Sequence, residues 1–158
     1  MIVYADASAL VKQYVTEPGS KEVIGLTSMA AVVATALVSR AEVASAFARA
    51  VRMGVLDDNG GRRAQRSFAR DWPDFARVVI TEALVARAEA LAWQLGLRGY
   101  DAIQLAAALT WREAVGQEVV LATLDRQLWR AGSQMGLKVW PAQPPSEVRV
   151  SRGGKLSK

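Results

Sequence analysis

The chain has 158 residues, 51% of them apolar and 22% charged, which is typical of one globular domain with a buried core. It contains no cysteine and no histidine, which excludes disulfides, thiolate zinc sites, imidazole bases and the Ser-His-Asp triad. Any catalysis must therefore use carboxylates, hydroxyls, Lys, Arg, Tyr or an oxygen-bound metal such as Mg²⁺ or Mn²⁺. The net charge of +5 favours a polyanionic partner such as nucleic acid, although a coding bias toward Arg and Ala would produce the same charge.

The sequence predicts neither a membrane span nor a signal peptide. No apolar run approaches the roughly 20 residues that a membrane span needs. The N-terminus lacks the basic region of a signal peptide and Asp6 interrupts its apolar run, so a cytoplasmic protein is expected. Pro-Pro, Gly-Gly and basic residues from Pro144 to Lys158 predict a disordered basic tail after a domain spanning 1–143.

The apolar periodicity predicts an alternation of strands and helices. In chain order the predicted elements are a strand at 2–5, helices at 8–14 and 20–29, a strand at 32–36, helices at 39–53 and 57–68, a strand at 77–80, helices at 81–95 and 101–115, a strand at 119–122, a helix at 126–135 and a strand at 138–140. The helix at 57–68 is expected to be interrupted at Gly60-Gly61. This order indicates an α/β domain with a mostly parallel sheet, whose ligand crevice lies beyond the carboxyl ends of the strands.

Four isolated acids stand in apolar or small-residue surroundings: Asp6, Glu42, Asp101 and Asp125. Carboxylates rarely occur in such places unless they cap a helix, pair with a cation or bind a metal. Asp6 and Asp125 both fall at predicted strand ends, where a shared site would lie. If the four converge, they form an oxygen-rich site for a hard divalent cation, which indicates phosphodiester chemistry.

Each acid also has a structural explanation. Glu42 completes a capping box with Ser39, and each of the three aspartates fits the N-cap of a helix. Capping does not explain why the acids share apolar surroundings, nor why Ser8 and Thr123 stand beside them. Such hydroxyls orient carboxylates or water around a metal, although a serine at a helix start is common without one.

Other residues are candidates for contact with nucleic acid or a protein partner. Arg62, Arg66 and Arg70 recur every four residues and would line one helical face, either clamping phosphates or facing solvent. Arg126 would meet phosphate or neutralise the neighbouring acid. The Ala- and Leu-rich surroundings of Trp93 and Trp111 predict core packing, and Trp72, in a presumed loop, is the one tryptophan to test for base stacking or partner contact.

Four segments carry a family resemblance: Val3-Tyr-Ala-Asp6-Ala-Ser8-Ala-Leu, Ser39-Arg-Ala-Glu42-Val-Ala-Ser-Ala, Gly99-Tyr-Asp101-Ala-Ile-Gln-Leu-Ala-Ala-Ala and Leu121-Ala-Thr-Leu-Asp125-Arg-Gln-Leu. In order and spacing they resemble the PIN domain and, more narrowly, the VapC toxins of bacterial toxin–antitoxin pairs. The resemblance spans Met1 to Pro141. Many relatives carry a further acid where this chain has Gln127, which bears on a second metal rather than the first.

The resemblance implies a three-layer α/β/α fold and a Mg²⁺- or Mn²⁺-dependent ribonuclease. Asp6, Asp101 and Asp125 would hold metal, with Glu42 as a ligand or a base. RNA would be the substrate, a VapB antitoxin would hold the enzyme inactive, and homodimers are usual among the relatives. Two alternatives stay open: a PIN-like nuclease of RNA maturation or of DNA without an antitoxin, and a PIN-like scaffold that binds RNA or protein without cutting.

Overall fold

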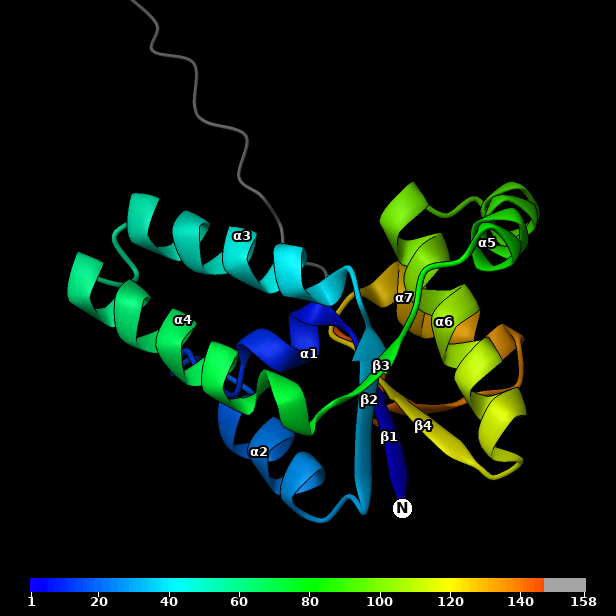
Figure 1. The fold of residues 1–158 in the computed structure, drawn as a ribbon, viewed down its shortest axis with the longest axis horizontal. Coiled ribbons are helices and arrows are strands. Elements are labelled where there is room, and N and C mark those ends of the chain that lie inside the picture. Colours follow the sequence, from blue (N-terminus) through cyan, green and yellow to red (C-terminus); the bar gives the residue numbers. More distant parts are fainter. Residues whose placement is uncertain (147–158) are drawn as a thin grey trace, which may run out of the picture.

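A computed structural model of the protein describes residues 1–146, in which one parallel sheet carries helices on both faces (Figure 1). The strands are β1 (Ile2–Ala5), β2 (Val32–Ala36), β3 (Ala76–Val78), β4 (Val119–Ala122) and β5 (Lys138–Trp140). They lie in the order β3-β2-β1-β4-β5, and all neighbouring strands are parallel. The predicted three-layer α/β/α architecture with a central parallel sheet is confirmed.

The helices divide between the two faces of the sheet. They are α1 (Ala7–Val11), α2 (Ser20–Ser28), α3 (Ser39–Arg52), α4 (Asp58–Asp71), the short 3-10 helix η1 (Trp72–Asp74), α5 (Glu82–Leu95), α6 (Gly99–Val115) and α7 (Arg126–Gln134). Helices α1 to α4 cover one face, and α5 to α7 cover the other (Figure 1). Each face therefore has its own apolar core.

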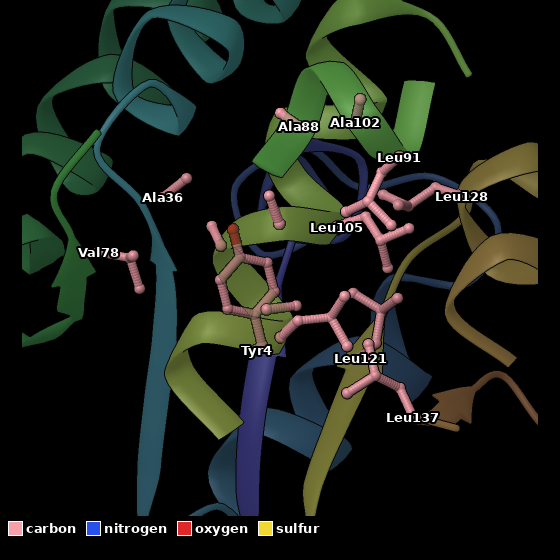
Figure 2. Close-up of a cluster of buried hydrophobic side chains, with 14 of the residues drawn as sticks. Tyr4, Ala36, Val78, Ala88, Leu91, Ala102, Leu105, Leu121, Leu128 and Leu137 are labelled. Carbon is pink, nitrogen blue, oxygen red and sulfur yellow. The ribbon is translucent and has the colours of Figure 1, made fainter. Parts of the chain in front are cut away.

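The central strand β1 supplies both cores because alternate side chains of a strand point to opposite faces. Val3 and Ala5 are buried against α1, α3 and α4. Tyr4 is buried on the other face, among leucines such as Leu105 and Leu121 (Figure 2). With both faces covered, the strands are continuous apolar runs, which is why their positions could be predicted well.

The order of the strands changes sides at β1. The chain passes from β1 to β2 and β3 on one side, and then returns to place β4 on the other side of β1. Such a switch point opens a crevice at the carboxyl ends of the two strands. Ala5 pairs with Ala122 at those ends, so the residues that follow, Asp6 and Thr123, emerge side by side.

The predicted break in the fourth helix is wrong. Helix α4 runs without interruption from Asp58 to Asp71 through Gly60 and Gly61. A Cβ atom at Gly61 would lie 2.5 Å from Cγ2 of Val51 in α3. This glycine therefore permits the close approach of α3 and α4 and does not end a helix.

Two predictions for tryptophans were wrong. Trp72 is 5% exposed and packs edge-on against Phe68 and Phe75 in the core, so it offers no face for a base. Trp93 is 93% exposed, because α5 turns this side of the helix to solvent. Trp111 is partly buried against the core, as predicted.

Helix α7 follows Asp125 directly. Gly132 allows this helix to lie close to the sheet. A Cβ there would clash with Leu121 and lie 3.3 Å from Val139 Cγ1. Gly132→Ala is therefore expected to reduce the free energy of unfolding by about 1–3 kcal/mol. Gly25→Ala in α2 is the control: nothing lies within 4 Å of its added Cβ, so a gain of about 0.5–1 kcal/mol is expected.

Urea denaturation of both variants measures this difference, and similar stabilities would contradict the close packing of α7 on β4.

In residues 1–146 no helix is both long and apolar enough to cross a membrane. The predicted tail, 144–158, falls outside the described residues except for its first three positions.

Candidate active site

Asp6 directly follows β1 and is the N-cap of α1. Its Oδ1 accepts hydrogen bonds from the Ser8 hydroxyl at 2.7 Å and from the Ala9 N–H at 3.0 Å. Its Oδ2 accepts a hydrogen bond from the Thr123 hydroxyl at 2.9 Å. The side chain is 5% exposed. Capping is therefore confirmed for Asp6, and both predicted hydroxyls hold its carboxylate in one orientation.

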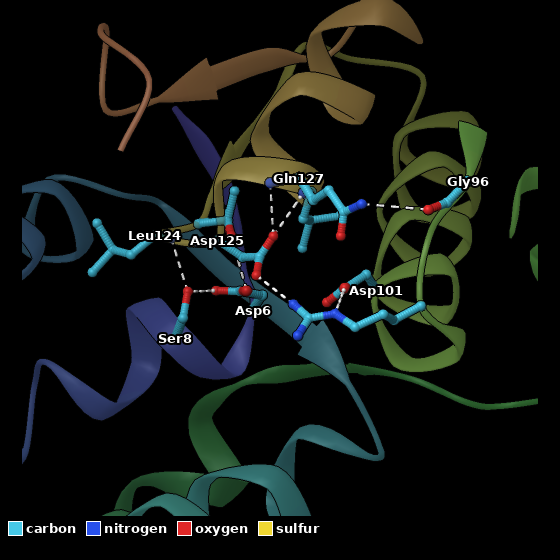
Figure 3. A network of polar contacts seen from close by, with 10 residues as sticks. Asp6, Ser8, Gly96, Asp101, Leu124, Asp125 and Gln127 are labelled. Atoms are coloured by element: carbon cyan, nitrogen blue, oxygen red, sulfur yellow. Dashed lines mark hydrogen bonds and ion pairs between the residues drawn. The ribbon is translucent and has the colours of Figure 1, made fainter. Parts of the chain in front are cut away.

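Asp125 lies three residues after the end of β4. It is the N-cap of α7, and its Oδ1 accepts from the backbone N–H groups of Gln127 and Leu128 at 2.8 and 2.9 Å. The hydroxyl of Ser8 accepts from the Leu124 N–H at 2.8 Å, which ties this segment to α1. Helix capping thus fixes the positions of both carboxylates at the switch point (Figure 3).

Glu42 is held differently from the predicted capping box, which does not form. Helix α3 has Val38 as its N-cap and no side-chain capping bond, so Ser39 lies inside the helix. Oε2 of Glu42 accepts a hydrogen bond from Nε2 of Gln104 at 2.5 Å. The Tyr4 hydroxyl donates to Oε1 of the same glutamine at 2.7 Å, so a buried amide connects Glu42 to the central strand.

This contact belongs to a buried polar network that was not predicted from the sequence. Nε2 of Gln104 also donates to the Ser39 hydroxyl at 2.9 Å, and the Ser39 and Thr35 hydroxyls lie 2.8 Å apart. Thr35 donates to the Ala5 carbonyl at 2.7 Å. The buried polar side chains of the described chain are Asp6, Ser20, Thr35, Ser39, Gln104 and Thr123, and all but Ser20 belong to the site. The sequence did hold one signal for this network, namely Gln104, a polar residue within an apolar helical run.

Asp101 lies in the first turn of α6, and the N-cap of that helix is Arg98. The alternative in which Asp101 caps the helix is therefore wrong. Oδ2 of Asp101 accepts from Nε of Arg98 at 2.9 Å, and Nη2 of Arg98 reaches Oδ2 of Asp125 at 2.7 Å (Figure 3). One guanidinium thus bridges two of the four acids, a role that was not foreseen.

The pKa values of Asp6, Glu42 and Asp101 are all raised, and neighbouring acids contribute to each increase. Burial raises the pKa of Asp6 to about 6, against its hydrogen bonds, and the charge of Asp125 adds to the increase. Burial also raises the pKa of Glu42 to about 7, with contributions from Asp6 and Asp101. The pKa of Asp101 is raised by burial and by Asp125, while Arg98 opposes the increase. Burial and the smaller mutual repulsion both favour either protonation of these acids or a cation beside them.

The donor set suits a hard divalent cation. All four side chains offer carboxylate oxygens, the ligands that Mg²⁺ and Mn²⁺ prefer. Within residues 1–146 no group of three acidic, His or Cys side chains is arranged as it stands to hold a metal. The guanidinium of Arg98 instead supplies positive charge between Asp101 and Asp125.

The predicted basic face lies on α4, away from this bridge. Arg62, Arg66 and Arg70 are exposed, and Arg70 pairs with its neighbour Asp71 at 3.0 Å. Arg126 is the first residue of α7, adjacent to the fourth acid. Contact of these arginines with RNA or a partner stays a prediction.

Gln127, where many relatives have an acid, faces the loop between α5 and α6. Its side-chain amide donates to the Gly96 carbonyl at 3.4 Å (Figure 3). It therefore connects α7 to the loop that carries Arg98.

Replacing Gln104 by Met is expected to slow catalysis by about 10–100-fold, because Glu42 would lose the donor that orients it. Tyr4→Phe is the matched variant, since it removes only the far contact of the same amide. It should cost about 1–2 kcal/mol of stability and leave the rate near that of the wild type. Cleavage rates and urea denaturation of both variants check this. Equal rates for Gln104→Met and wild type would show that Glu42 does not depend on Gln104.

The fold and the site together define a class of protein. The PIN domain model matches residues 3–133, so the chain belongs to the PIN domain family. It is 35% identical over 143 residues to Ribonuclease VapC45 and to Ribonuclease VapC49, from two strains of Mycobacterium tuberculosis. Each alignment covers 90% of this chain and 96% of the relative.

Solved structures show the same fold. One from a toxin–antitoxin complex of Klebsiella pneumoniae has a TM-score of 0.60 and 18% identity, covering 87% of this chain and 94% of that one. Another, from VapBC2 of Rickettsia felis bound to a promoter DNA fragment, has a TM-score of 0.61 and 11% identity, covering 89% and 99%. At these identities the likeness concerns the fold alone.

Proposed function

We propose that this protein is a metal-dependent endoribonuclease and the toxin of a VapBC-type pair, with Mg²⁺ as cofactor and Mn²⁺ as a possible substitute. The observation that carries the proposal is the gathering of Asp6, Glu42, Asp101 and Asp125 at the switch point of a PIN fold. The 35% identity to two ribonucleases across 90% of the chain supports the reaction class.

In this proposal Asp6, Asp101 and Asp125 hold the divalent ion, and Glu42 is a further ligand or the base. The ion supplies Lewis-acid activation of water and neutralises the charge that develops on the phosphate. Ser8 and Thr123 fix the orientation of Asp6, so its oxygens need little reorganisation. Gln104 holds Glu42, whose pKa of about 7, raised chiefly by burial, suits a group that takes a proton from the attacking water.

If water attacks phosphorus and the P–O3′ bond breaks, the 3′ oxygen leaves as a hydroxyl after taking up a proton, and the phosphate stays on the 5′ oxygen. This route needs no 2′-hydroxyl as nucleophile. The test is digestion of total cellular RNA by the purified protein in Mg²⁺, Mn²⁺ or EDTA, followed by analysis of the product ends. Metal-dependent cutting with 5′-phosphate ends is expected. Cutting that persists in EDTA, or 2′,3′-cyclic phosphate ends, would contradict the route. Digestion of single-stranded DNA under the same conditions tests whether RNA is required.

A cognate VapB-type antitoxin is the proposed protein partner. Support comes from the VapC names of the sequence relatives and from neighbours described as VapBC2 and as a toxin–antitoxin complex. Co-expression with the product of a small adjacent reading frame should give a complex that no longer cuts RNA. A fully active protein without such a partner would favour the nuclease of RNA maturation.

A catalytically inactive scaffold is the remaining alternative. Folded, antitoxin-free protein that neither cuts RNA nor binds Mg²⁺ or Mn²⁺ at millimolar concentration in calorimetry would support it. A homodimer is part of the proposal by analogy with the family, and light scattering of the purified chain tests it.

A further inference from the structure

Arg98 lies in the connection between α5 and α6, three residues before Asp101. Its Nε donates to Oδ2 of Asp101 at 2.9 Å, and its Nη2 donates to Oδ2 of Asp125 at 2.7 Å. The two acids come from different elements, the start of α6 and the end of the β4–α7 connection. Arg98 therefore joins the two sides of the candidate site with a single positive charge.

Helix capping gives no reason for an arginine at this position. Arg98 is the N-cap of α6, in an extended conformation and without a side-chain capping bond. Ser, Thr, Asp and Asn are the preferred N-caps, and a cation at a helix N-terminus is opposed by the helix dipole. The two carboxylates compensate for this cost, so the position of Arg98 is explained by the site.

The bridge is placed so that it can be released. The Arg98 side chain is 70% exposed, whereas the side chains of Asp101 and Asp125 are 16% and 26% exposed. An ion pair of such an exposed group contributes little stability, typically about 0–1 kcal/mol. The guanidinium can turn into solvent without displacing packed side chains, while the carboxylates stay in place.

Arg98 and a metal would need the same oxygen atom of Asp125. Oδ1 of Asp125 is engaged by the N–H groups of Gln127 and Leu128, which leaves Oδ2 as the atom that faces the site and Arg98. The atom of Asp101 that accepts from Arg98 is likewise Oδ2. A cation shared by both aspartates therefore competes with the guanidinium.

We propose that Arg98 is the built-in counter-ion of the site, which neutralises Asp101 and Asp125 until a divalent cation displaces it and then binds a phosphate of the substrate. The inference rests on the proposed function and names a regulation of the same site. A guanidinium presents a rigid fork of donors that suits a phosphate, and after displacement it stays beside the metal because the backbone of Arg98 is fixed at the start of α6. By linkage, whatever Arg98 contributes to the metal-free site is subtracted from the affinity for metal.

The test is calorimetric titration of the full chain with Mn²⁺, comparing wild type, Arg98→Met and Arg87→Met. Arg87 forms a bidentate pair with Glu113 at 2.7 Å on α5 and α6, so its replacement removes the same charge and the same kind of contact elsewhere. We expect Arg98→Met to bind Mn²⁺ up to about 5-fold more tightly than wild type, the factor that corresponds to the upper limit for such an exposed ion pair. Arg87→Met should bind as wild type does, and Arg98→Lys should lie between wild type and Arg98→Met.

The same variants are then compared in RNA cleavage at saturating Mn²⁺. Arg98→Met should have a higher KM for RNA in spite of its tighter metal binding, a combination that a merely structural role would not produce. Equal or weaker Mn²⁺ affinity in Arg98→Met would overturn the counter-ion role, and an unchanged KM would overturn the phosphate contact. Absence of Mn²⁺ binding in wild type and variants alike would overturn the metal-dependent function itself.

Discussion

Replacing Asp6 by Asn is expected to lower the rate of metal-dependent RNA cleavage by about a thousand-fold in a protein that stays folded. A catalytic metal stabilises the transition state by several kcal/mol, and each 1.36 kcal/mol corresponds to a factor of ten in rate. The amide has nearly the shape of the carboxylate and can still cap α1 through the Ala9 N–H. The variant therefore removes the charge with little change in structure. Asp101→Asn should lower the rate in the same way.

The chain offers a matched control in Asp57→Asn. Asp57 is the N-cap of α4 and accepts from the Gly60 N–H, so the substitution changes an equivalent capping carboxylate outside the site. Single-turnover cleavage of labelled RNA in Mn²⁺, with thermal melting of each variant, is the measurement. Asp57→Asn should cut as wild type does. If Asp6→Asn also cuts at the wild-type rate, the assignment of these acids to a metal site is wrong.

The metal-free protein is expected to lose stability as the pH rises from about 4 to about 7. Burial raises the pKa of Asp6 from 3.8 to about 6 and that of Glu42 from 4.5 to about 7. Between the unfolded and folded values the folded protein binds more protons, so both contributions are fully present below pH 4 and are lost as the pH passes 6 to 7. For Asp6, which is 5% exposed, a change of two pKa units corresponds to about 3 kcal/mol.

The contribution of Asp6 is isolated by urea denaturation of wild type and Asp6→Asn at several pH values in EDTA. The stability of the variant relative to wild type should increase by about 1–2 kcal/mol between pH 5 and pH 8. Millimolar Mn²⁺ should raise the melting temperature of wild type at pH 8 and have less effect at pH 5, because protonated carboxylates bind metal poorly. A difference between the two proteins that does not change with pH would contradict the raised pKa of Asp6.

Several features of the fold followed from short-range patterns. The strands Val32–Ala36, Val119–Ala122 and Lys138–Trp140 have the predicted bounds. For Val119–Ala122 the reason is that a strand covered on both faces is a continuous apolar run. Capping explains Asp6 and Asp125, since a strand end followed by a helix start is a local arrangement. The capping box of Glu42 fails because Gln104, 62 positions away in the chain, offers a buried donor.

The residue types of the chain by themselves determined the chemistry that is possible. Without histidine and cysteine, catalysis is limited to carboxylates, hydroxyls, Lys, Arg, Tyr or an oxygen-bound metal, and the carboxylates at strand ends indicated where a site would lie. Tertiary structure alone decided which side chains are buried and which are exposed. The face that α5 presents to solvent exposes Trp93, and the packing of α4 on α3 buries Trp72. Arg98 stands in a glycine-flanked loop that is typical of a solvated arginine. Asp101 is only three residues away from it, whereas Asp125 is 27 positions away and is brought to the guanidinium only by the approach of α6 to the end of β4. Contacts between residues so far apart in sequence depend on how whole elements pack, which no local pattern encodes.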